Sequence, residues 1–147
     1  MARWARNKKR SEIKPLILMD QLILKESIKH KLAWPTREPK EAEPYEGARI
    51  TEPKIGLHKS VQNYDVKQMY PSIIINEGIS PDKDHIIVPN VLKELKKLRA
   101  VYKKKYQETN SKEDYITQYS YKVLANLVYG GYGNGYCRFY DLSLIHI

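Results

Sequence analysis

Two basic side chains one helical turn apart are the first residues whose types and spacing could do chemistry. Arg99 and Lys103 lie four residues apart in a segment with the apolar period of a helix, so both would project from one face. A guanidinium group offers phosphate oxygens a planar fork, and an ammonium group adds a mobile point charge. This pair could therefore bind a triphosphate. The alternative is a cationic face that points to solvent, and the spacing alone leaves both readings open.

A row of polar residues follows in the next expected helix. The row has intervals of four, four and three residues, and its members are Gln118, Lys122, Asn126 and Tyr129. That spacing would place charged, amide and phenol groups on one side of the helix. Apolar residues occupy the opposite side, so the polar row faces either solvent or a ligand.

One carboxylate precedes a turn into a helix. Asp65 ends an expected strand, and Tyr70 lies five residues later where a helix is expected to begin. Backbone N–H groups at a helix start can bind phosphate, and a neighbouring carboxylate could hold a Mg²⁺ ion shared with the phosphates. The alternative is that Asp65 is a helix cap or an ordinary surface residue.

The helices and strands that must position these residues predict an α+β fold. Helices are expected over 14–31, 70–78, 89–107 and 114–129. Short antiparallel strands are expected over 48–51, 60–65 and 86–88, after a connector that contains three prolines between residues 34 and 44. Two helices joined by a short polar turn would form an antiparallel hairpin beside this small sheet.

The amino-acid composition limits the class of binding partner and the cellular compartment that we expect. The 147 residues allow one compact domain, and the net charge of +9 favours a polyanion such as nucleic acid. The single cysteine, Cys137, allows neither an intramolecular disulfide nor a cysteine-rich metal site. The apolar stretch 15–24 is too short to span a membrane. We therefore expect a cytoplasmic protein with no membrane partner.

Taken together, several stretches resemble the motifs of family B DNA polymerases. Residues 65–74, DVKQMYPSII, resemble the DxxSLYPSII motif, and the ISPD sequence at 79–82 matches the motif that follows it. Residues 45–49, YEGAR, resemble the YxGG motif, and residues 122–130 resemble KxxxNSxYG. Residues 91–103 are similar to the first helix of the fingers domain. The resemblance runs from about residue 45 to 140, and it departs from the family pattern at Ala48, Gln68, Met69 and Leu127.

The resemblance implies roles around a two-metal Mg²⁺ site. The carboxylate of Asp65 and the backbone carbonyl of Val66 would bind the catalytic metals. Tyr70 would be the steric gate that leaves no room for a 2′-hydroxyl, so the implied substrate is a dNTP. Backbone N–H groups at Gln68 and Met69 would meet the triphosphate.

The resemblance also implies roles for the fingers and for the DNA contacts. Arg99, Lys103 and Lys122 would supply positive charge that binds the triphosphate, and Asn126 would lie beside the phosphates. Tyr129 and Gly130 would face the nascent base pair, and Tyr45 and Gly47 would touch DNA. The implied partners are primer–template DNA and the remainder of the polymerase.

The resemblance divides the chain into four segments. These are an N-terminal helix and connector (1–44), a partial palm (45–88), a fingers hairpin (89–130) and the truncated start of a return to the palm (131–147). The sequence contains no DTDS motif, which carries the second catalytic carboxylate of the family. We therefore expect a fragment that does not polymerise alone. The alternatives are one part of a split polymerase, a non-catalytic nucleic-acid-binding remnant, or a basic helical interaction module.

Overall fold

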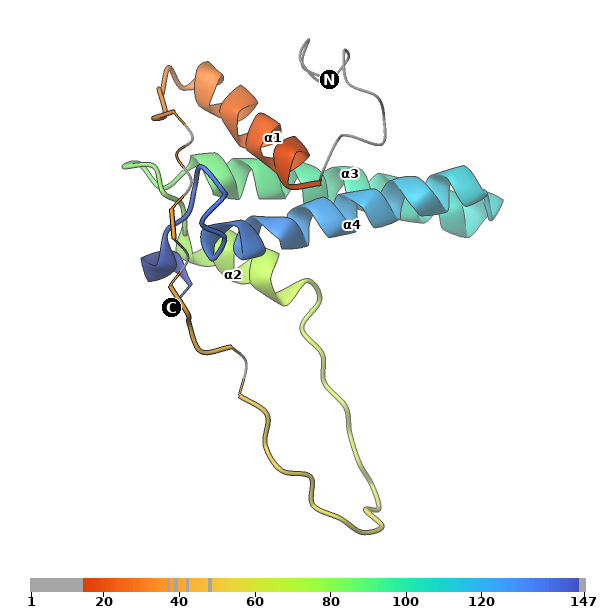
Figure 1. The fold of residues 1–147 in the computed structure, drawn as a ribbon. Coiled ribbons are helices and arrows are strands. Elements are labelled where there is room, and N and C mark those ends of the chain that lie inside the picture. The colour runs from red at the N-terminus through yellow and green to blue at the C-terminus, as the bar shows by residue number, and fades with distance from the viewer. Residues whose placement is uncertain (1–14, 37, 39, 42, 48, 146–147) are drawn as a thin grey trace.

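The computed structural model of this chain describes residues 15–36, 38, 40–41, 43–47 and 49–145. Its helices are α1 (Pro15–Lys29), α2 (Met69–Glu77), α3 (Ile87–Thr109) and α4 (Lys112–Tyr132), followed by the 3₁₀ helix Leu142–Leu144. The helix α3 lies alongside α4 over most of its length, and α1 and α2 each contact both of these helices (Figure 1). Within the described residues, the core is therefore a helical pair covered by α1 and α2.

The turn between α3 and α4 follows from its local residues. Asn110 takes the left-handed conformation (φ 53°) that ends α3, and its N–H donates to the carbonyl of Tyr106 at 2.8 Å. Ser111 precedes α4, and Glu113 and Asp114 lie in its first turn. Negative charge there stabilises the helix through its interaction with the helix dipole. The polar turn expected between the two helices is confirmed.

The start of α3 is fixed by two buried polar residues. The Asp82 carboxylate accepts from the backbone N–H groups of Ile86 at 2.9 Å and Ile87 at 3.2 Å. The Ser80 hydroxyl donates to Asp82 and accepts from the N–H of Val88 at 3.1 Å. Three backbone donors that a helix start leaves unpaired are thereby satisfied. In this chain the ISPD sequence is therefore a helix cap.

The expected α+β fold is wrong. The structure is helical, and none of its described residues forms a strand. Residues 86–88 belong to the start of α3, because the cap just described favours a helix over the short apolar strand that the sequence suggested. Such short apolar runs cannot be assigned to strand or helix by periodicity alone.

The other two expected strands lie in a long loop that projects away from the helices (Figure 1). The side chains of Ile50, Ile55 and Val61 are 92%, 98% and 72% exposed, so this loop buries no apolar face. A strand needs a partner that completes its backbone hydrogen bonds, and the described residues supply none here. Ala48, residues 1–14 and residues 146–147, on which several expectations rested, lie outside the described residues.

Candidate anion-binding site

Most of the residues predicted to bind a nucleotide line one cavity. The cavity has a volume of about 300 Å³ and lies between the loop that leads into α2, the middle of α3 and the middle of α4. Its lining consists of Asp65, Lys67, Gln68, Met69, Tyr70, Arg99, Lys122 and Asn126. We call this space the first cavity. Residues up to 61 positions apart in the sequence, such as Asp65 and Asn126, thus lie around one space.

A second cavity adjoins the first. It has a volume of about 280 Å³ and is lined by Lys67, Gln68, Lys96, Arg99, Ala100 and Lys103. Lys67, Gln68 and Arg99 line both spaces, so the two cavities share a wall. Lys103 was predicted to act with Arg99, and the structure places it in the second cavity only.

A strained turn at the end of the loop before α2 forms part of the wall of both cavities. Gln68 has a left-handed backbone conformation (φ 53°, ψ 57°), which a residue other than glycine adopts at some energetic cost. Its carbonyl accepts from the N–H of Ser72 at 2.9 Å, which starts α2. The Ser72 hydroxyl donates to the carbonyl of Lys67 at 3.2 Å and accepts from Nζ of Lys96 at 3.0 Å. These bonds tie the turn to α3.

Two buried donors in the cavity walls have no hydrogen-bond partner. They are Nε2 of Gln68 and Nε of Arg99. A buried donor without a partner costs about 1–3 kcal/mol.

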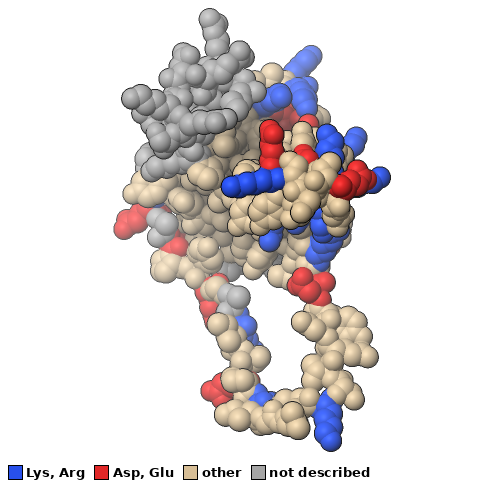
Figure 2. Space-filling view, turned by 90° about the vertical axis from the view of Figure 1, so that its right-hand side faces the viewer, with Lys and Arg blue, Asp and Glu red and all other residues tan. Residues whose placement is uncertain are grey.

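The charge of the two cavities is strongly positive. Among the described residues that line them, Asp65 is the one carboxylate, and the cations are Lys67, Lys96, Arg99, Lys103 and Lys122. Lys and Arg side chains also spread over the helical body when it is viewed from the tip of α3 and α4 (Figure 2). Clustered cations on walls of low dielectric concentrate anions at a site. The arrangement therefore suits a phosphate-bearing ligand.

Two tyrosine rings form a flat edge beside the first cavity. The rings of Tyr70 and Tyr129 stack with their centroids 4.2 Å apart and an angle of 14° between their planes. Burial raises the pKa of the Tyr129 hydroxyl, and the hydroxyls of Tyr70 and Tyr45 add to this effect. The ring of Tyr45 also lies where a side chain on Gly133 would be. Tyr129 is thus next to a residue of the cavity wall without lining the cavity itself, and Tyr45 lies near Tyr129.

The remaining predicted site residues lie further from the cavities. Val66 follows Asp65 and is 60% exposed, and Gly130 follows Tyr129 on an exposed face of α4. Gly47 lies in the projecting loop, where an added Cβ would meet no atom within 4 Å. Gln118 is 9% exposed, so this residue leaves the predicted polar row of α4 and joins the packed interior.

Sequence reasoning did not select Lys67 and Lys96 as site residues. Lys67 lies between two predicted residues, Asp65 and Gln68, and Lys96 precedes Arg99 by three positions, which places it on the same helix face. Both signals are local and were available in the sequence. Their closeness in space depends on the packing of α2 against α3, and the sequence does not reveal this packing.

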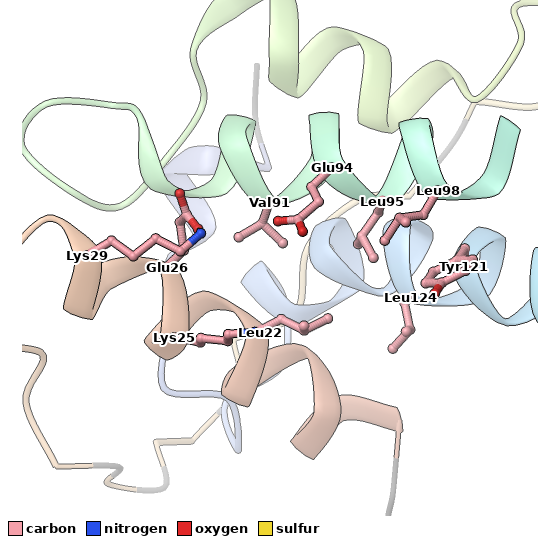
Figure 3. A pocket seen from close by; sticks show the side chains of 10 residues that line it. All are labelled: Leu22, Lys25, Glu26, Lys29, Val91, Glu94, Leu95, Leu98, Tyr121 and Leu124. Atoms are coloured by element: carbon pink, nitrogen blue, oxygen red, sulfur yellow. The ribbon is translucent and has the colours of Figure 1, made fainter. Parts of the chain in front are cut away.

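A further groove separates α1 from the α3–α4 pair. It has a volume of about 250 Å³ and largely apolar walls that include Leu22, Leu95 and Leu124 (Figure 3). The lysines at its edge are accompanied by carboxylates, and Lys29 pairs with Glu26 at 2.5 Å. This balance of charge does not favour an anion, and the groove contains none of the predicted site residues.

Two kinds of feature are absent from the described part of the chain. No group of three or more His, Cys, Asp or Glu side chains is arranged to hold a metal ion. None of the described helices combines the length and the apolar character that crossing a bilayer requires.

Comparison with known proteins finds curated relatives. "DNA polymerase 1" of Pyrococcus abyssi is 30% identical over 124 residues, covering 67% of this chain and 16% of the relative. A "DNA polymerase" of Thermococcus gorgonarius is 32% identical over 124 residues with the same coverage of both chains. A "DNA polymerase" of Archaeoglobus fulgidus is 54% identical over 44 residues, or 30% of this chain and 6% of the relative. No family model and no solved structure matches this chain.

Proposed function

This chain is homologous to a segment of the archaeal DNA polymerases, and we propose that it forms the nucleotide-binding part of the palm and fingers of a family B enzyme. The observation that carries the proposal is the first cavity. Three motif stretches that are distant in the sequence contribute Asp65, Tyr70, Arg99, Lys122 and Asn126 to its wall. The positive charge of that wall suits a triphosphate.

The reaction of the parent enzyme would extend a primer in DNA replication or repair. The 3′-hydroxyl of the primer attacks the α-phosphorus of a dNTP, a new phosphodiester bond forms, and the bond to the leaving pyrophosphate breaks. Arg99, Lys103 and Lys122 would hold the phosphates, with Asn126 beside them.

The cytoplasmic location expected from the sequence stays a prediction.

The remaining roles concern the sugar, the base pair and the DNA. The ring of Tyr70, stacked on Tyr129, would pack below the deoxyribose and exclude a 2′-hydroxyl. Tyr129 and Gly130 would face the nascent base pair. Tyr45 and Gly47 would contact primer–template DNA when the rest of the polymerase is present.

The residues of this chain fit a Mg²⁺ ion that is held jointly with a nucleotide. Mg²⁺ usually binds through one or two carboxylates together with phosphate oxygens and water. The Asp65 carboxylate lines the first cavity together with cations that attract phosphate, and the backbone carbonyl of Val66 would be the second oxygen ligand from this chain. When bound, Mg²⁺ would neutralise charge that develops on the phosphate oxygens.

A single carboxylate in the cavity predicts that this chain binds a nucleotide without polymerising it. The two-metal reaction needs a second carboxylate, and Asp65 is the one carboxylate among the described residues of the cavity wall. The same observation favours a second candidate function: a nucleic-acid-binding remnant, or one part of a split polymerase.

The test is a titration of the whole chain with dTTP and Mg²⁺. We expect wild type to bind and the variant with both Arg99→Ala and Lys122→Ala to lose at least about tenfold in affinity, since charge-assisted hydrogen bonds contribute about 1.5–3 kcal/mol each. Lys104→Gln is the control, because Lys104 is 79% exposed and lies outside both cavities. Equal binding by wild type and the double variant would refute the proposed site.

A further inference from the structure

Three tyrosine rings adjoin one another on the outer half of the α3–α4 pair. The rings of Tyr115 and Tyr119, one turn apart on α4, have their centroids 6.2 Å apart and an angle of 17° between their planes. The centroid of the Tyr106 ring on α3 lies 5.3 Å from that of Tyr115. None of these three tyrosines lines the first or the second cavity. The proposed nucleotide site therefore gives them no role.

The two rings on α4 leave much of their surface in solvent. Tyr115 is 45% exposed and Tyr119 is 50% exposed, whereas Tyr132 near the end of the same helix is 1% exposed. Packing within the described residues therefore does not account for this pair. Two nearly parallel rings offer flat faces on which a further flat ring can stack. The pair is thus suited to a ligand that carries aromatic rings.

The same part of the helical pair carries more than half of the net charge. Residues 96–122 contain eight Lys and Arg against three Asp and Glu, so they contribute +5 of the total of +9. The three carboxylates belong to Glu108, Glu113 and Asp114, and Glu108 pairs with Lys104 at 3.9 Å. Lys and Arg side chains lie on several sides of the helical body in the view onto this tip (Figure 2). The surplus of positive charge attracts a polyanion.

Helical spacing connects the two exposed rings to the first cavity. Tyr115, Tyr119, Lys122 and Asn126 follow one another at intervals of four, three and four residues, which places them along one side of α4. Lys122 and Asn126 line the first cavity. Because an α-helix rises about 1.5 Å per residue, Tyr119 lies only about 5 Å along the helix from Lys122. A chain of phosphates could therefore pass from the rings to a cation.

We propose that Tyr106, Tyr115 and Tyr119 form a binding platform for the unpaired bases of single-stranded nucleic acid. Aromatic side chains bind such bases by stacking, and cations beside them hold the phosphate backbone. In a duplex the base faces are stacked on one another, so the platform selects single strands. An acidic protein would match the charge but would make no use of parallel aromatic faces. The platform lies outside both cavities, so this inference goes beyond the proposed function and does not depend on it.

The experiment measures binding of fluorescein-labelled oligo(dT) of about twelve nucleotides to the whole chain by fluorescence anisotropy, at constant ionic strength. The same oligonucleotide paired with its complement supplies the duplex, and a polyglutamate peptide serves as an acidic competitor. One double variant combines Tyr115→Ala with Tyr119→Ala, and a second combines Tyr115→Phe with Tyr119→Phe. Ile116→Ala is the matched control, because Ile116 is 52% exposed on the same turn of α4. Far-UV circular dichroism establishes that each variant keeps its helical content.

The platform predicts a loss that follows the aromatic ring. Affinity for the single strand should fall at least about tenfold in the double alanine variant, because two stacking rings are removed. The double phenylalanine variant and Ile116→Ala should stay within about twofold of wild type, since both keep two rings. Duplex affinity should change less than about twofold in every variant. Binding of dTTP should also stay unchanged, because these residues lie outside both cavities.

Four results would overturn the platform. The first is single-strand affinity that stays within about twofold in the double alanine variant. The second is an equal loss in the double phenylalanine variant or in Ile116→Ala, which would exclude stacking on the rings as the cause. The third is displacement of the oligonucleotide by polyglutamate at an equal concentration of charge. The fourth is a wild-type chain that binds dTTP but no oligonucleotide, which leaves the proposed function standing; the converse result would leave the platform standing and refute the nucleotide site.

Discussion

At the scale of single residues, one tyrosine lies at the edge of the proposed nucleotide site. Tyr70 lines the first cavity, is 38% exposed, and stacks on Tyr129, which fixes the plane of its ring. A fixed ring can reject an extra hydroxyl by steric conflict, whereas a mobile one would move aside.

Replacement of this ring should therefore relax sugar discrimination. We expect Tyr70→Ala to narrow the ratio of dATP to ATP affinity about tenfold, because the space for a 2′-hydroxyl opens. The measurement is competition binding in the presence of Mg²⁺. Tyr64→Ala is the control, since Tyr64 is 86% exposed in the projecting loop. An unchanged ratio in Tyr70→Ala would contradict the role of steric gate.

The sequence predicted much of the cavity at this scale, because motif residues keep their chemistry wherever the chain places them. Type and spacing made Asp65, Arg99 and Lys122 candidates, and the family resemblance assigned their roles. Gln118 was misplaced, because helical spacing gives a face but not whether that face is covered. Lys67 was missed, because its relevance comes from the left-handed turn at Gln68, which no spacing rule indicates.

Another single residue is expected to lower stability in alkaline solution. Tyr132 is 1% exposed, and burial raises the pKa of its hydroxyl above the ordinary value of 10.0. Below pH 10 the folded and unfolded chains both keep this proton. Above pH 10 the unfolded chain releases it while the folded chain retains it, so stability falls as pH rises, by up to about 1.4 kcal/mol per pH unit.

The measurement is urea unfolding of wild type and Tyr132→Phe between pH 8 and pH 11. We expect the wild-type midpoint to fall more steeply above pH 10 than that of Tyr132→Phe, which has no phenolic proton to lose. Parallel curves for the two proteins would show that the titration of Tyr132 does not destabilise the fold.

At the scale of elements, the helix starts and the helix crossings were harder to foresee than the helices themselves. The helices at 14–31, 89–107 and 114–129 were predicted mainly from the spacing of their apolar residues, and the helix at 70–78 from Pro71 near its start and Gly78 at its end. The strand expected at 86–88 was wrong because its apolar residues fit a helix start equally well, and the buried Ser80–Asp82 pair decides between the two. The strands expected in the loop were wrong because a lone extended segment has no partner.

The cap of α3 gives a sharp stability prediction. Asp82→Ala leaves the N–H groups of Ile86 and Ile87 without their acceptor in a buried position, so we expect a loss of about 2 kcal/mol in the free energy of unfolding. Asp84→Ala is the matched control, because Asp84 is exposed. Chemical denaturation measures both. Equal stability of the two variants would contradict the cap.

Helix α1 approaches α4 closely at one glycine. A Cβ on Gly131 would lie 2.9 Å from Cε of Met19, whereas a Cβ on Gly130 would meet no atom within 4 Å. We expect Gly131→Val to destabilise the chain by about 1–3 kcal/mol through overpacking. Gly130→Ala should stabilise it by about 0.5–1 kcal/mol through helix propensity. Thermal unfolding of both variants measures the contrast, and a stable Gly131→Val would refute the close crossing.

At the scale of the whole molecule, the chain combines a packed helical body with a loop that buries little. The body brings α2, α3 and α4 around the two cavities, and the loop between residues 49 and 64 leaves apolar side chains exposed. The curated relatives are several times longer, since this chain spans 16% of the Pyrococcus abyssi protein. The net charge of +9 indicated an anionic partner, but it could not indicate which surface binds it.

The central claim is that one site, formed by the turn before α2 and the facing sides of α3 and α4, binds the nucleotide. The most direct measurement is a titration of the ¹⁵N-labelled chain with dTTP and Mg²⁺, followed by two-dimensional NMR. We predict that the largest shifts occur at residues 66–70, 96–103 and 122–126, and that Lys122→Ala reduces them together. Shifts centred on the groove between α1 and the helical pair, or no shifts in a folded chain, would contradict the account.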